Sequence, residues 1–120
     1  MGMDVDLLLG TAGPDMPPSL EQFAPEVAEV LGVELVEVSS SRRTFFGQSE
    51  DFRAWLAFHP ESEEPSLSHP FILELGAEMG TEAEVGARVF QKLADTRRFR
   101  VVLLLDHDCV RSTHFPCEDW

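Results

Sequence analysis

Two segments with helical periodicity, each lying between segments with β-strand patterns, constrain the fold more than any other feature of this sequence. The first helix is expected over residues 20–31, where apolar side chains recur every three or four positions and Gly32 follows as a stop signal. The second is expected from residue 82, with one apolar stripe that continues through Ala94. These two helices divide the β-type segments into three groups.

Both helices are preceded by the pattern of a capping box, in which an N-cap hydroxyl and the side chain three residues later satisfy free backbone N–H groups. The first pair is Ser19 with Gln22, and the second is Thr81 with Glu84. The second pair fits the pattern better. Pro25 lies inside the first helical segment and cannot donate a backbone hydrogen bond, so we expect a kink or a late helix start there.

The β-type segments are recognised by runs of β-branched and aromatic residues or by strict alternation of apolar and polar side chains. Together with the helices they give the order β-α-β-β-β-α-β. The expected strands cover residues 5–10, a run from 33–39 into 42–46, 52–59, 71–78 and 100–106.

This order predicts an α+β fold, a two-layer sandwich in a single domain of residues 1–120. Each helix would connect two strands as a right-handed βαβ crossover, giving a mixed sheet of about five strands with two helices on one face, a relative of the ferredoxin-like topology. Segment 100–106 is apolar on both faces and is therefore expected to be central and parallel to a neighbour.

With both helices on one side, the other face of the sheet should be partly open. Alternation along segments 52–59 and 71–78 assigns five side chains to that open face. They are Arg53, Trp55, His59, Ile72 and Glu74.

The charge of the chain is its most unusual bulk property, because 22 acidic residues against nine Lys and Arg give a net charge of −13. Such a field repels nucleic acid phosphates and anionic membranes, and it favours a basic protein partner. No apolar run reaches the length of a membrane span and no secretory signal is visible, so we expect no membrane association and a cytoplasmic location. There Cys109 and Cys117 would be reduced, although their spacing allows a disulfide under oxidising conditions.

The C-terminal segment 103–120 is rich in side chains that bind metals or transfer protons. Its ligand spacing lacks the two tight pairs of a structural zinc site, and no nucleophile motif surrounds its thiols. We therefore expect no metal, no cofactor and no catalytic residue. The side chains concerned are Asp106, His107, Asp108, Cys109, His114 and Cys117.

A second group of side chains combines acids with aromatic residues in and around the predicted meander. Acidic rims accelerate association with a basic partner, and aromatic anchors carry much of the affinity of protein interfaces. The sequence therefore predicts a partner-binding surface formed by Glu50, Asp51, Glu61, Glu63, Glu64, Phe45, Phe46 and Trp55.

A small α+β domain with strong acidity and no catalytic signature resembles many bacterial toxin-immunity and inhibitor proteins. Those proteins neutralise a basic enzyme by covering it, which would make this chain a non-enzymatic inhibitor of a basic toxin. Two alternatives are a small metal-dependent enzyme or metalloprotein that uses the C-terminal segment, and a dimeric ligand-sensing regulatory domain. The oligomeric state is left open.

Overall fold

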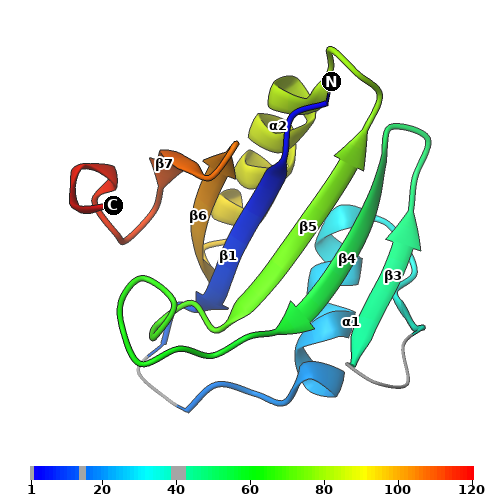
Figure 1. Cartoon of the computed structure of the whole chain (residues 1–120). Helices are drawn as coiled ribbons and strands as arrows, with labels where there is room; N and C mark the ends of the chain where they lie inside the picture. The colour runs from blue at the N-terminus through cyan, green and yellow to red at the C-terminus, as the bar shows by residue number, and fades with distance from the viewer. Residues whose placement is uncertain (1, 14–15, 39–42) are drawn as a thin grey trace.

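In the computed structural model, which describes residues 2–13, 16–38 and 43–120, the strands form one sheet of seven strands in the order β2-β3-β4-β5-β1-β6-β7 (Figure 1). Every neighbouring pair of strands is antiparallel. The strands are β1 (Val5–Thr11), β2 (Val36–Glu37), β3 (Thr44–Gln48), β4 (Phe52–Phe58), β5 (Phe71–Ala77), β6 (Phe99–Leu105) and β7 (Asp108–Ser112).

The α+β class is confirmed, but the expectation of a mixed sheet of about five strands is wrong. The run expected over 33–46 contains two strands, β2 and β3, which pair with each other in antiparallel orientation. The chain also continues past β6 through a tight turn into β7. Helix α2 connects β5 to β6, which are parallel to each other but separated by β1, and α1 leads from β1 to β2 at the edge of the sheet. Neither helix therefore connects two adjacent parallel strands. The relation to the ferredoxin-like topology remains a prediction.

Strand β6 lies second from the edge of the sheet and pairs antiparallel with both β1 and β7, so the expected parallel neighbour is wrong. Its apolar character has another cause. Val101 and Leu103 face the helices, whereas Val102 and Leu104 face the opposite side, where Phe115 of the C-terminal tail packs on them. A folded-back tail, and not a second layer of helices, buries the outer face of this strand.

Helix α1 (Leu20–Leu31) begins and ends where the sequence predicts. The Ser19 hydroxyl accepts a hydrogen bond from the Gln22 N–H, and the Gln22 side chain accepts one from the Ser19 N–H, so the capping box is confirmed. Gly32 ends the helix in the left-handed region with φ of 71°, which costs glycine little. Because the helix already starts at Leu20 and runs through Pro25, a late start is wrong.

Helix α2 (Glu82–Asp95) lacks the capping box expected from Thr81 and Glu84, since the Thr81 side chain makes no capping hydrogen bond. The Thr81 hydroxyl donates to the Glu78 carbonyl oxygen instead. The carboxylate of Glu82, the first residue of the helix, instead accepts N–H hydrogen bonds from two residues before the helix, Met3 at 2.8 Å and Gly80 at 2.6 Å. The N–H groups of Met3, of Glu82 itself and of Gly80 hold the pKa of this carboxyl below its usual range.

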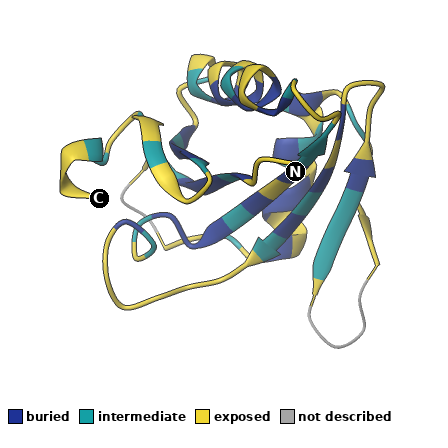
Figure 2. Ribbon diagram, turned by 45° about the horizontal axis from the view of Figure 1, so that its top comes forward, coloured by how far each residue is buried: buried dark blue, intermediate teal, exposed yellow. Residues whose placement is uncertain are grey.

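Both helices lie on one face of the sheet, as predicted; in Figure 1 they are behind the strands. The core between the layers contains the Phe23 ring of α1 stacked on Phe71 of β5, with 3.9 Å between ring centroids. The same ring meets Phe99 of β6 edge to face at 5.6 Å. Buried and more exposed positions alternate along β4 and β5, which leaves every second side chain of these strands for the other face (Figure 2).

Candidate functional site

The face of the sheet that the helices leave uncovered carries a continuous row of side chains, to which each strand contributes one residue. The pairing register places these residues opposite one another from edge to edge. We call this set the open-face row: Val36, Phe46, Trp55, Glu74, Asp6, Leu104 and Cys109, in strand order β2 to β7. It combines apolar, aromatic and acidic side chains in one line.

The prediction of five side chains for the open face is confirmed. Trp55 and Glu74 belong to the open-face row, and together with His59 and Ile72 they line a groove of about 530 Å³. Thr44 and Ala57 complete its lining. Arg53 lies on the same face, with its guanidinium carbon 5.9 Å from the centre of the Trp55 ring. The groove is thus bordered by an aromatic ring and a carboxylate.

Asp6 and Glu74 are directly opposite each other on β1 and β5. Like charges in this position destabilise a sheet. Within the described ranges, neither carboxylate is within ion-pairing distance of an Arg or Lys side chain. Burial raises the pKa of the Asp6 carboxyl, and the Glu74 carboxylate raises it further, while His107 acts in the opposite direction. The row therefore contains two carboxylates that form no ion pair with an Arg or Lys of the described residues.

Of the aromatic residues predicted to bind a partner, Phe46 and Trp55 do lie together. Their ring centroids are 5.3 Å apart, and both side chains are half-buried on the open face. Phe45 points to the other side of the sheet, where it packs against the main core. Two of the three predicted anchors are therefore available to one surface, and Phe45 is not.

The five acidic residues predicted for the same surface are divided between the two ends of β4. Glu50 and Asp51 occupy the turn before Phe52, and Asp51 is 3.5 Å from Arg88 of α2 in an ion pair. These residues border a separate hollow of about 420 Å³ that reaches the start of α2.

The other three acids follow Phe58, at the far end of this strand. Glu61 is 3.4 Å from His59, and Glu64 accepts hydrogen bonds at 2.7 Å from both the N–H and the hydroxyl of Ser68. Glu64 thus supports the fold of its own loop. At about 3.3 Å per residue, a strand of seven residues separates the two acidic groups by roughly 20 Å. The predicted residues do not form one site.

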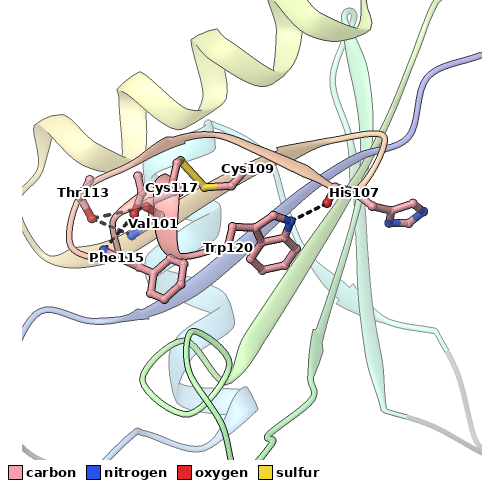
Figure 3. The surroundings of a disulfide bond; sticks show 8 residues. Val101, His107, Cys109, Thr113, Phe115, Cys117 and Trp120 are labelled. Carbon is pink, nitrogen blue, oxygen red and sulfur yellow. Dashed lines mark hydrogen bonds between the residues drawn. A yellow bond between two sulfur atoms is a disulfide. The ribbon is translucent and has the colours of Figure 1, made fainter.

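The C-terminal segment is organised by a disulfide between Cys109 and Cys117, so the expectation of reduced thiols is wrong (Figure 3). Asp106 and His107 both have positive φ, 48° and 70°, as in the tight turns that join antiparallel strands. Asp106 and His107 thus form the turn between β6 and β7. With both sulfur atoms bonded to each other, no thiolate is available there for a metal or for nucleophilic attack.

No group of three or more His, Cys, Asp and Glu side chains in the described residues is placed to hold a metal ion. The described residues also contain no helix that is both long and apolar enough to cross a membrane.

The tail after β7 folds back against the sheet (Figure 3). Thr113 continues the pairing by exchanging hydrogen bonds of 2.9 Å with Val101, and the Trp120 indole N–H donates to the His107 carbonyl oxygen at 2.9 Å. Phe115 packs on the apolar cluster of Leu8, Val102 and Leu104. The tail therefore covers one half of the open face, around Leu8, Val102 and Leu104. The other half, from β3 to Glu74 of β5 with the half-buried Asp6 at its border, stays uncovered.

Sequence reasoning did not single out Asp6, although a signal was present. In the expected strand 5–10, Asp6 is flanked by Val5 and Leu7, both buried in the main core. This alternation already places Asp6 on the open face. Its position opposite Glu74 depends on the β1–β5 pairing, which the sequence does not reveal.

Comparisons of this chain with protein families, with curated proteins and with solved structures find no match. The fold and the site define its class: an α+β protein whose antiparallel sheet is covered by helices on one face and presents a groove of aromatic and acidic side chains on the other.

We predict that Asp6→Asn stabilises the protein at pH 7 by roughly 0.2–1 kcal/mol, because it removes one of two opposed carboxylates. The raised pKa of Asp6 fixes the sign of the pH dependence: the cost of its charge is present at neutral pH and disappears as the pH falls below 3.8. Denaturant unfolding at pH 7 and at about pH 3 measures the difference. Glu29→Gln, on the exposed side of α1, is the control with the same change of charge. A destabilised Asp6→Asn at pH 7 would contradict this account.

We also predict that reduction of the disulfide, or replacement of both cysteines by serine, releases the tail and leaves the sheet folded. The bond closes a short loop between residues separated by eight positions, so its loss costs at most roughly 3 kcal/mol in the chain-entropy view. Hydrogen exchange followed by mass spectrometry should show faster exchange in residues 113–120, with β4 and β5 unchanged. Equal exchange of the tail in both redox states would show that the disulfide does not hold it.

Proposed function

We propose that this chain is a non-enzymatic acidic domain that binds a basic protein partner, and that the uncovered half of the open face is its docking surface. The observation that carries the proposal is the open-face row. There Phe46 and Trp55 lie beside Glu74 and Asp6, which form no ion pair with an Arg or Lys of the described residues. Surfaces that bind cationic partners typically contain aromatic anchors, which carry much of the affinity, and acidic side chains, which complement the charge of the partner.

The net charge of −13 supports the same function at longer range. A field of this size steers a positively charged protein towards the molecule and raises the association rate. The acidic groups at the two ends of β4 then serve as a rim around the docking surface, with Glu61 and Glu63 at one end and Glu50 at the other. In this proposal Asp51 is engaged by Arg88 and contributes less.

The predictions about the type of partner, the topology of the fold and the cellular location belong to the same proposal. Inhibition of a basic bacterial toxin is supported by acidity, small size and an uncovered sheet face. The ferredoxin-like relation is supported by the order β4-β5-β1-β6 of the four long strands, with α1 after β1 and α2 after β5. The cytoplasmic location is proposed from the sequence alone, and the Cys109–Cys117 disulfide argues against it, because disulfides are typical of oxidising compartments.

The test is co-purification with the basic product of the neighbouring gene, followed by stopped-flow measurement of the association rate. We expect a complex whose association rate falls about tenfold or more when the salt concentration rises from about 0.01 M to about 1 M. The dissociation rate should change much less, because short-range contacts determine it. An association rate independent of ionic strength would contradict steering by charge.

A further inference from the structure

We infer that the groove beside Trp55 and Glu74 takes an arginine side chain of the partner, with its guanidinium held between the carboxylates of Glu74 and Asp6 and the aromatic surface of Trp55. This inference rests on the proposed function and specifies which partner group enters the site.

The first support is that an aromatic ring and two carboxylates occupy adjacent positions in the open-face row. Neighbouring strands are about 4.8 Å apart, so Trp55, Glu74 and Asp6 present one ring and two carboxylates within about 10 Å. A guanidinium is a planar cation that binds carboxylates through paired N–H donors and stacks on aromatic rings. A lysine ammonium is a compact point charge and gains less from the ring and from two separate acceptors.

The second support is the shape and lining of the groove. Its volume of about 530 Å³ accommodates a long side chain, and Ala57 and Ile72 supply apolar surface for the methylene stem. Glu74 lines the same groove and is opposite Asp6. The stem and the charged head of an arginine thus find complementary surroundings in one place.

The third support comes from the protein's own Arg53. Its guanidinium carbon is 5.9 Å from the centre of the Trp55 ring, so this ring already accepts a guanidinium neighbour. Both side chains pass over Gly76, where an added Cβ would lie 3.3 Å from the Trp55 ring and 3.5 Å from Arg53 Nε. Arg53 forms no ion pair with Glu74 or Asp6 in the described part of the chain, so we expect both carboxylates to be open to a second cation.

The fourth support is energetic. Two opposed carboxylates reduce the stability of the free protein, and a cation bound between them removes that repulsion. A site that is unfavourable when empty and relieved by its ligand explains why an acid pair occurs in the middle of a sheet face.

The experiment measures binding of a capped oligo-arginine peptide and of an oligo-lysine peptide of equal length by calorimetry. The test variant is the double substitution Asp6→Asn/Glu74→Gln, and the control is Glu29→Gln/Glu84→Gln, at two exposed positions of the helices. Both variants lose two negative charges, so the overall field changes equally. The test variant is expected to be more stable than the wild type, so loss of binding cannot be attributed to unfolding.

We expect the test variant to bind oligo-arginine about tenfold more weakly, and the control variant to change by less than about twofold. The wild type should prefer oligo-arginine to oligo-lysine. Equal weakening in the two variants would show binding by the general field and would overturn the site. Equal affinity for both peptides would overturn the choice of arginine. A partner complex that survives in the test variant would overturn this inference alone, whereas absence of any partner complex would overturn the proposed function.

Discussion

The antiparallel pairing of β1 with β5 on one side and β6 on the other is the constraint on which the rest of the structure depends. Because side chains alternate along a strand, this pairing sends Val5 and Leu7 into the core under the helices and Asp6 to the opposite face. The same register brings Asp6 next to Glu74 of β5 and Leu104 of β6. A slip of one residue would bury the acid and expose the core.

From this pairing follows a division of the open face into two halves. On the β6 side, apolar residues are covered by the tail, which the Cys109–Cys117 disulfide and the Trp120 indole hold in place. On the β4 side, Trp55 and the adjoining groove stay uncovered. The tail thus covers the apolar part of the outer surface, and a mixed aromatic and acidic part stays uncovered, which is the docking surface that we propose. The net charge of −13 acts in the same direction as this local chemistry.

Much of this architecture follows from local patterns. The positions of both helices, the cap at Ser19 and the alternation in 52–59 and 71–78 depend on neighbouring residues, and they were predictable. The hydrogen bond from the Met3 N–H to the Glu82 side chain at the start of α2 was not predictable, because the two residues are 79 positions apart in the sequence.

The sequence predicted a parallel neighbour for the apolar segment 100–106, because no pattern within this segment shows that the tail after β7 folds back and covers its outer face. The separation of the two acidic groups, in contrast, could have been predicted. They flank a strand of seven residues, whose length alone keeps them apart.

The most direct test of the account is carboxyl-detected NMR titration of Asp6 in the free protein and in the presence of the oligo-arginine peptide. The account predicts a pKa above the ordinary value of 3.8 in the free protein, because the carboxyl is partly buried and opposite Glu74. It also predicts that the pKa falls when the peptide binds, because a guanidinium favours the charged form. A pKa of Asp6 that is ordinary in the free protein and unchanged by the peptide would contradict the claim that this pair is a cation-binding site.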